Sequence, residues 1–300
     1  MYFLGIDLGT SSVKIIIMDE SGKVVNTTTR DFEISYPHIG WAEQNPDDWW
    51  DGTKEGIREI IKLSGLKSDE IKGIGFSGQM HGLVLLDKEN KVLMPAILWC
   101  DQRTQEECDY LNNVIGQDKL SKYTANMALT GFTAPKVLWV KKHKPDIYNK
   151  IYKMMLPKDY IRFKLTGLFA TDVSDASGTL MFDVKNRKWS NEMLNILEID
   201  EEVLPKVFES YQVTGRVCIE AANVTGLSTE TLVVAGAGDQ AAGAVGTGTV
   251  DSGVVSVALG TSGVVFACDK KFSVDSKNRL HSFCHANGRY HQMGVMLSAA

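Results

Sequence analysis

One tetrapeptide, Leu-Gly-Thr-Ser, occurs twice in the sequence, as Leu8–Ser11 and as Leu259–Ser262. In both places it stands between two apolar runs rich in β-branched residues, which predicts a hairpin each time. The two copies are too far apart for a solenoid repeat. Because the turn recurs together with its flanking strands, we infer two related lobes. The flanking runs are Tyr2–Asp7 and Val13–Met18 in the first copy, and Val254–Ala258 and Val264–Cys268 in the second.

A tight turn of this composition can bind phosphate oxygens. The glycine leaves backbone N–H groups free, and the threonine and serine add hydroxyl donors. A single copy would more often serve only as a hairpin turn, but two copies could face each other across a cleft, and the duplication favours phosphate binding. The sequence contains no G-x-x-x-x-G-K-[ST] motif, which excludes a Walker-type phosphate loop.

A second glycine pattern, Gly73–Gly78, matches G-x-G-x-x-G and could indicate a dinucleotide-binding fold. Its glycines fall within the β-like run Ile71–Phe76. Another apolar run, Leu83–Leu86, comes next, where the dinucleotide fold requires the start of a helix. The context therefore argues against dinucleotide binding.

Composition narrows the function classes. The 300 residues include 32 Lys and Arg against 37 Asp and Glu, a formal charge of −5, so nucleic acid is not an expected partner. With 44% hydrophobic and 23% charged residues, the chain has the composition of a globular protein. No apolar run approaches the roughly 18 residues of a membrane span, and we expect a cytoplasmic protein without a membrane partner. The five cysteines lack metal-binding spacing and are expected to be reduced thiols.

The remaining elements predict an α/β protein with a helix-rich middle. Asn45 and Pro46 predict the start of a helix that ends near Gly65. Helical apolar spacing dominates from about residue 102 to residue 223. A strand, a glycine-rich turn and a helix of small residues follow, up to a linker that begins at Gly246. Further strands are predicted at Val24–Thr29, Ile71–Phe76 and Leu232–Ala235.

Several segments carry a resemblance to one family: Gly5–Ser11, Gly40–Pro46 with Trp49 and Trp50, Gly131–His143, Gly238–Gly243 and Leu259–Gly263. Together they resemble the FGGY carbohydrate kinases. The resemblance implies an α/β fold of the duplicated actin/hexokinase/Hsp70 type, which is ribonuclease H-like, with ATP bound between two lobes. Family members continue through a complete second lobe. We therefore expect a sugar-binding domain at residues 1–246 and the start of a truncated nucleotide-binding domain at residues 247–300.

Within the family, Ser77–Gly82 resembles the xylulokinase branch, because glycerol kinases carry an Arg-Glu pair where Met80 and His81 stand. The activity that this resemblance implies is ATP-dependent phosphorylation of a ketopentose, with the C5 hydroxyl of D-xylulose as the first candidate. Ribulose, glycerol, gluconate or a deoxy-ketose remain open as substrates. Two rival hypotheses are a non-catalytic sugar-binding fragment and an actin- or Hsp70-like nucleotide switch, which would need no sugar pocket.

The resemblance places the proton acceptor at Asp239, although a helix N-cap would be the first interpretation without it. Asp7 ends the first strand and, with Asp239, would hold Mg²⁺ partly through water, while an Asx turn is the alternative for Asp7. ATP and Mg²⁺ are the expected cofactors. The phosphates would be bound by Gly9, Thr10, Ser11 and Lys14 from the first lobe and by Gly260, Thr261 and Ser262 from the second.

The sugar is expected beside the turn that follows the strand Ile71–Phe76. There Met80 would form an apolar wall, His81 would exchange a hydrogen bond with a hydroxyl, and Trp99 would offer a flat surface to the C–H face of the sugar. Local structure is the alternative role for His81, and core packing for Trp99. A small sugar and ATP are the expected partners, and a homodimer is left open. The full set of sugar-binding candidates is Gln79, Met80, His81, Trp99, Asp101 and Gln240.

Overall fold

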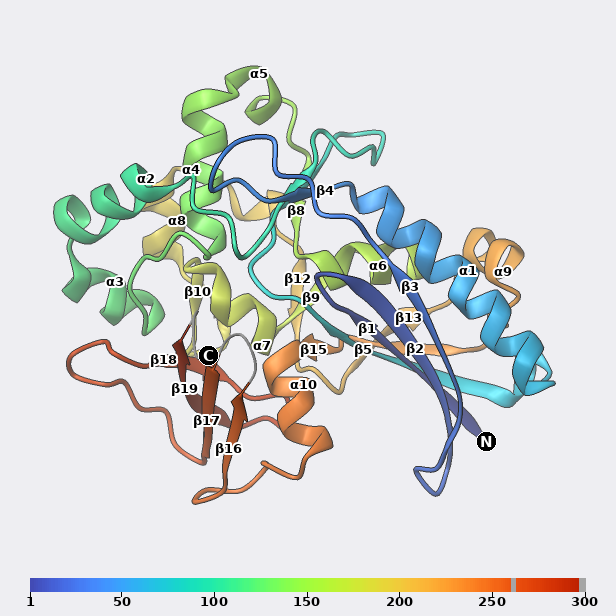
Figure 1. The fold of residues 1–300 in the computed structure, drawn as a ribbon. Helices are drawn as coiled ribbons and strands as arrows, with labels where there is room; N and C mark the ends of the chain where they lie inside the picture. Colours follow the sequence, from blue (N-terminus) through green and yellow to red (C-terminus); the bar gives the residue numbers. More distant parts are fainter. Residues whose placement is uncertain (260–262, 297–300) are drawn as a thin grey trace.

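The computed structural model of the chain describes residues 1–259 and 263–296. Its largest sheet has seven strands in the order β13-β14-β5-β1-β2-β3, and the short β15 also pairs with β5 (Figure 1). The first three strands form the predicted antiparallel meander, whereas β5, β14 and β15 run parallel to β1. These strands are β1 Tyr2–Leu8, β2 Ser12–Asp19, β3 Val24–Asp31, β5 Ile71–Gly78, β13 Val213–Arg216, β14 Leu232–Val234 and β15 Ala237–Gly238.

Helix α1, Pro46–Ser64, packs against the meander. The side chain of Asn45 caps its first turn and Gly65 ends it at a φ of 65°, so both predicted helix boundaries are confirmed. Gly56 lies where the helix crosses the sheet, and a Cβ at this position would be 2.7 Å from Cδ1 of Ile15. A residue without a side chain is therefore needed for this close approach.

The middle of the chain is rich in helices, as predicted, but short strands lie among these helices and also before them. Each has only two or three residues, too few to display the alternation by which strands are predicted. Within the described ranges, no helix is both long and apolar enough to cross a membrane. The short strands are β4 Glu43–Gln44, β6 Val84–Leu86, β7 Ala96–Ile97, β8 Lys153–Met155, β9 Ala170–Asp172, β10 Phe182–Asp183, β11 Lys188–Trp189 and β12 Lys206–Phe208. The helices are η1 Ser68–Glu70, α2 Gln105–Asp109, η2 Tyr110–Gly116, α3 Gln117–Thr124, α4 Thr133–His143, α5 Pro145–Tyr148, α6 Pro157–Thr166, α7 Val173–Ala176, η3 Ser177–Thr179, α8 Asn191–Leu197, η4 Glu201–Val203 and α9 Ile219–Thr225.

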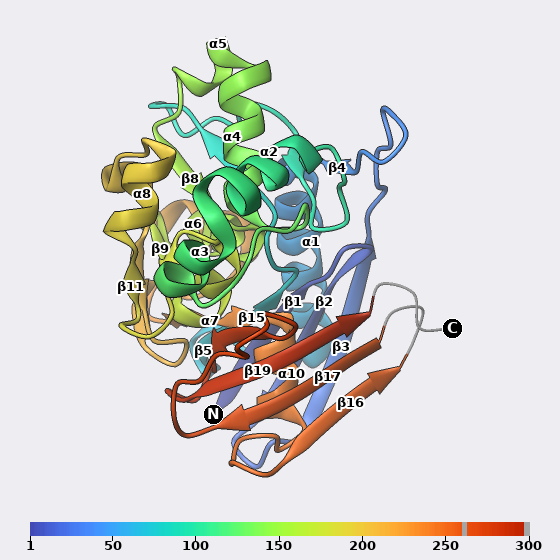
Figure 2. The same cartoon turned by 90° about the vertical axis from the view of Figure 1, so that its left-hand side faces the viewer.

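Beyond helix α10, Asp239–Gly246, the chain forms a second, antiparallel sheet in the order β16-β17-β19-β18 (Figure 1 and Figure 2). Leu259 pairs with Gly263 across β16 and β17, the two strands that flank the second tetrapeptide. The predicted phosphate-binding residues Gly260, Thr261 and Ser262 lie outside the described residues. The strands are β16 Val255–Leu259, β17 Gly263–Asp269, β18 His281–Cys284 and β19 Tyr290–Met296.

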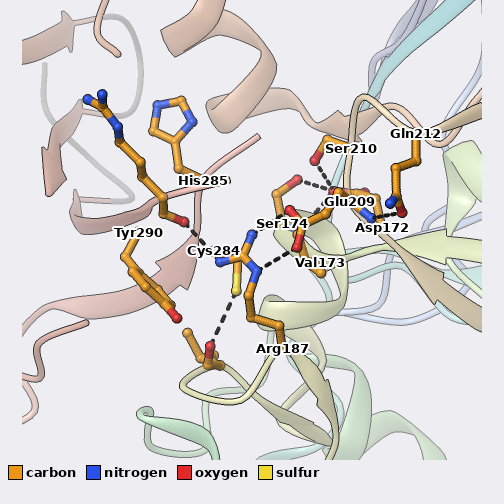
Figure 3. Close-up of polar contacts among 12 residues, drawn as sticks. Asp172, Val173, Ser174, Arg187, Glu209, Ser210, Gln212, Cys284, His285 and Tyr290 are labelled. Atoms are coloured by element: carbon orange, nitrogen blue, oxygen red, sulfur yellow. Dashed lines mark hydrogen bonds and ion pairs between the residues drawn. The ribbon is translucent and has the colours of Figure 1, made fainter. Parts of the chain in front are cut away.

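The second sheet packs directly against the helix-rich part of the chain. Phe266 and Phe283 belong to the same buried apolar cluster as Phe132, which precedes α4. The side chain of Arg187 forms an ion pair with Glu209 and also donates, over 3.1 Å, to the backbone oxygen of Arg289, which precedes β19 (Figure 3). Apolar packing and a charge-assisted hydrogen bond therefore both join the two parts.

Five charged side chains, here called the Lys158 cluster, are fully buried around α6 and α7: Lys158, Asp159, Arg162, Asp172 and Asp175. Nζ of Lys158 lies 2.7 Å from Oδ1 of Asp159, 2.8 Å from Oδ1 of Asp172 and 3.3 Å from Oδ2 of Asp175. Burial works to lower the pKa of Lys158, but the three carboxylates outweigh it and raise this pKa. Lys158 is therefore the central counter-charge of the cluster.

Replacing this lysine should destabilise the fold. In Lys158→Met the buried carboxylates lose their shared cation, and the free energy of unfolding should fall by about 3–5 kcal/mol in urea denaturation at neutral pH. The deficit should shrink at acidic pH, because protonation then removes the unpaired charges. Lys164→Met, at a half-buried position on the same helix that forms no ion pair with any described residue, is the control and should change the free energy by about 0.5 kcal/mol or less. Equal losses in the two variants would contradict the role given to Lys158.

Candidate active site

Three strand ends meet at one edge of the large sheet. Leu8, the last residue of β1, pairs with Gly78 of β5, and Gly78 pairs on its other side with Gly238 of β15. Because the three strands are parallel, the segments that follow them leave the sheet on the same side (Figure 1). Ligands of open α/β sheets bind at such carboxyl ends. The first Leu-Gly-Thr-Ser turn, the predicted sugar turn and the start of α10 are thereby neighbours.

Gln79 joins the first two of these segments. Its backbone N–H donates to the oxygen of Leu8 over 2.8 Å, and its side-chain amide donates to the oxygen of Gly9 over 3.4 Å. The hydroxyl of Thr10 donates to Oε1 of Gln79 over 3.3 Å and accepts from Nε1 of Trp99 over 2.9 Å. In this structure Gln79 and Thr10 therefore orient the turns, and they hold the partly exposed ring of Trp99 beside them.

The imidazole of His81 has a defined tautomer. Its Nδ1 lies 2.7 Å from the backbone oxygen of Gly178, and since a carbonyl oxygen only accepts, Nδ1 must carry the proton. Burial lowers the pKa of His81 to about 3, with a smaller contribution from the positive charge of Lys136, so the ring is neutral at physiological pH. Nε2 is consequently left as a hydrogen-bond acceptor, which suits a hydroxyl donor.

The backbone around His81 is held by unusual contacts. Its φ is 68°, and its carbonyl oxygen accepts from Nζ of Lys136 over 2.9 Å and from the hydroxyl of Thr133 over 3.1 Å. Lys136 is fully buried, and burial lowers its pKa to about 7. A Cβ at Gly178 would lie 2.4 Å from Cε1 of His81, so only glycine leaves room for the ring. Gly238 plays the same part for Met80, whose Cγ would lie 2.8 Å from a Cβ there.

Asp239 is the first residue of α10, at the N-terminus where it was predicted. Its Oδ1 accepts from the backbone N–H of Gln240 over 2.7 Å. Burial raises the pKa of Asp239 to about 6, and the negative charge of Asp7 contributes to the rise. The carboxylate is therefore ionised at neutral pH and yet basic enough to accept a proton, as a general base requires.

The other first-lobe candidates lie on β1, on β2 and in the turn between them. Asp7 pairs in register with Lys14 on β2 and with Ser77 on β5, and the side chains of Asp7, Ser11 and Lys14 are exposed. Two carboxylates at one sheet edge, Asp7 and Asp239, suit Mg²⁺, which prefers one or two carboxylates completed by phosphate and water. Among the described residues, no group of three or more metal-ligating side chains is present.

Asp101 is placed differently from the other sugar-binding candidates. It is fully buried, and its carboxylate accepts from the guanidinium of Arg103 over 2.7–3.0 Å and from the N–H of Ala42 over 2.7 Å. The guanidinium in turn lies 3.7 Å from the ring centroid of Trp41. Both oxygens of Asp101 are therefore hydrogen-bonded inside the protein, and the residue supports this loop.

Gln44 also contacts the candidate site, although it was not predicted from the sequence. This buried side chain donates to the backbone oxygen of Thr10 over 2.8 Å, and its Oε1 accepts from Nε1 of Trp49 over 3.1 Å and from the side-chain amide of Gln79 over 3.4 Å. Through these hydrogen bonds Gln44 supports the first Leu-Gly-Thr-Ser turn. The only available indication was its place inside the Gly40–Pro46 segment, since a single glutamine carries no periodic pattern.

Comparison with known proteins identifies the family. The N-terminal domain of the FGGY family of carbohydrate kinases matches residues 2–246. Xylulose kinases of Escherichia coli K12 and Bacillus subtilis 168 are 45% and 42% identical to the chain over 299 residues, which is 99% of the chain. The chain spans 61% and 60% of the length of these relatives.

Solved structures agree. The chain superposes on a xylulose kinase from Brucella ovis with a TM-score of 0.94 and 40% identity, covering 100% of this chain and 61% of that one. It superposes on a glycerol kinase from Plasmodium falciparum with a TM-score of 0.90 and 25% identity, covering 98% and 60%. The predicted actin/hexokinase-like fold class is thus confirmed, over about three fifths of the matched structures. The chain belongs to the FGGY family of carbohydrate kinases.

Proposed function

We propose that the intact protein is a cytoplasmic, ATP-dependent kinase that converts D-xylulose to D-xylulose 5-phosphate. The observation that carries this proposal is the meeting of Asp239, the His81 turn and the first Leu-Gly-Thr-Ser turn at one edge of the sheet. Similarity to proteins named xylulose kinases supports the choice of sugar.

In the proposed reaction the C5 hydroxyl oxygen of the sugar bonds to the γ-phosphorus of ATP, the bond from that phosphorus to the ADP oxygen breaks, and Asp239 takes the hydroxyl proton. Its pKa of about 6 lets it do so from the ionised state. Asp7 and Asp239 would hold Mg²⁺, which neutralises phosphate charge when bound. The phosphates would be bound by Gly9, Thr10, Ser11 and Lys14 from the first lobe and by Gly260, Thr261 and Ser262 from the second lobe.

For the sugar we propose that Nε2 of His81 accepts a hydrogen bond from one hydroxyl. Met80 would wall the pocket, Trp99 would stack on a C–H face, and Gln240 would contact a hydroxyl beside the base. Solved structures of a gluconate kinase, with 26% identity, and of the glycerol kinase have similar folds, so gluconate, glycerol and ribulose belong in the test panel. A coupled ADP-release assay over this panel should give the highest kcat/KM for D-xylulose, and a higher value for another sugar would reassign the substrate.

Asp239→Asn should abolish turnover in the intact protein. The amide cannot accept the proton, so kcat should fall by about 10³-fold or more while xylulose binding, measured by calorimetry, changes little. The wild-type kcat/KM should rise with pH up to about 6 and then level off, because the base must be ionised. The variant should be no less stable than the wild type, since it lacks a buried charge. Near-normal turnover would remove Asp239 from the mechanism.

His81→Asn tests the acceptor. Asparagine tolerates a positive φ, and its side-chain amide can replace Nδ1–H in the bond to Gly178, but it offers nothing at the position of Nε2. We expect the KM for xylulose to rise about tenfold, which corresponds to one lost hydrogen bond, with a smaller effect on kcat. His38→Asn, at an exposed position, is the control. An unchanged KM in the His81 variant would contradict the proposed contact.

A further inference from the structure

The backbone amide just before the proposed base is held by a buried serine. The N–H of Gly238 donates to Oγ of Ser174 over 3.1 Å. Because that oxygen accepts the N–H of Gly238, the hydroxyl of Ser174 donates its own proton to a different group, Oδ2 of Asp172. The same carboxylate oxygen accepts from the N–H of Ser174 over 2.8 Å and from the hydroxyl of Ser210 over 2.7 Å. Figure 3 displays both serines directed at Asp172.

The other oxygen of Asp172 connects this chain of bonds to the Lys158 cluster. Nζ of Lys158 lies 2.8 Å from Oδ1 of Asp172, and Lys158, Asp172 and Ser174 are all fully buried. An ionised acceptor strengthens the bond from a hydroxyl, and this in turn polarises the hydroxyl toward the amide. The N–H of Gly238 thus donates to the hydroxyl of Ser174, and this hydroxyl donates to the carboxylate of Asp172. The carboxylate in turn pairs with the ammonium group of Lys158.

Lys158 also supports the neighbouring strand. A Cβ at Gly78 would lie 2.8 Å from Cβ of Lys158, so the lysine stem packs directly beneath the end of β5. Gly78 is the residue that pairs with Gly238. The lysine thus lies beneath the strand that leads to the sugar turn, and through Asp172 and Ser174 it also reaches the strand that leads to Asp239.

We propose that Ser174 is a positioning residue for Asp239. It acts by holding the backbone amide of Gly238, and Asp172 and Lys158 hold Ser174 in place. The inference rests on the proposed kinase function. A displacement of a reacting group by about 1 Å can cost about a hundredfold in rate, so a fixed amide one residue before the base matters for turnover. The sugar turn has its own contacts through Gln79 and Lys136, and its binding function should not depend on Ser174.

Ser174→Ala and Ser210→Ala form a matched pair for the test. Both remove one hydroxyl from the same oxygen of Asp172, but only Ser174 contacts Gly238. In the intact protein, Ser174→Ala should lower kcat about tenfold with an unchanged KM for xylulose, whereas Ser210→Ala should stay within about twofold of the wild-type kcat. Similar melting temperatures for the two variants would separate positioning from general stability.

Residue-resolved hydrogen exchange on the same proteins supplies a readout that does not need activity. The amide of Gly238 should exchange at least about tenfold faster in Ser174→Ala, and the amide of Gln79, which donates to Leu8, should stay protected in both variants. Equal kcat values in the two serine variants, or unchanged exchange at Gly238, would overturn the inference. A wild type that phosphorylates no sugar would refute the proposed function instead, and exchange at Gly238 would still decide whether Ser174 holds this amide.

Discussion

The backbone pairing of β5 with β1 on one side and with β15 on the other puts Leu8, Gly78 and Gly238 in one row across the sheet. Each strand then ends at the same level, and the polar groups of three distant segments emerge together. Two of the three residues are glycines whose missing side chains leave space for Lys158 and for Met80. The pairing of the strands therefore fixes where the segments of the candidate site lie, independently of the side chains of the site.

The buried ionisable groups near these three paired residues fall into two kinds. In the Lys158 cluster, close carboxylates keep Lys158 charged, whereas burial raises the pKa of Asp175. Around the predicted sugar turn, burial instead disfavours charge: the ring of His81 is uncharged, and the pKa of Lys136 falls to about 7. Asp239 lies between these cases, since it is ionised at neutral pH but readily protonated. A buried polar environment can thus hold rigid supports and the proposed proton acceptor within the same small region.

Much of this could be predicted from local sequence. The meander, the capped helix after Asn45 and the placement of Asp239 at a helix N-terminus follow from propensity, capping and glycine placement, which act over a few residues. The hydrogen bond between Asp101 and the N–H of Ala42 could not be predicted in this way, because the two residues belong to distant segments of the chain. The link from Ser174 to Gly238 likewise joins residues far apart in the chain, and a serine among small residues has no distinctive pattern. Hydrogen bonds between polar groups that lie far apart in the chain cannot be predicted from the sequence alone.

Gly178 and Gly238 have a practical consequence for attempts to change substrate scope. The side chains of His81 and Met80, which we propose as walls of the sugar pocket, already pack against glycines, so room for a bulkier ligand cannot be created by shortening the residues behind them. Enlargement would have to come from shortening Met80 itself or from the ring of Trp99, which is tied to Thr10. Shortening Met80 leaves the backbone of the turn intact, whereas altering Trp99 also releases a hydroxyl that keeps two loops together. Redesign would therefore best begin at the methionine.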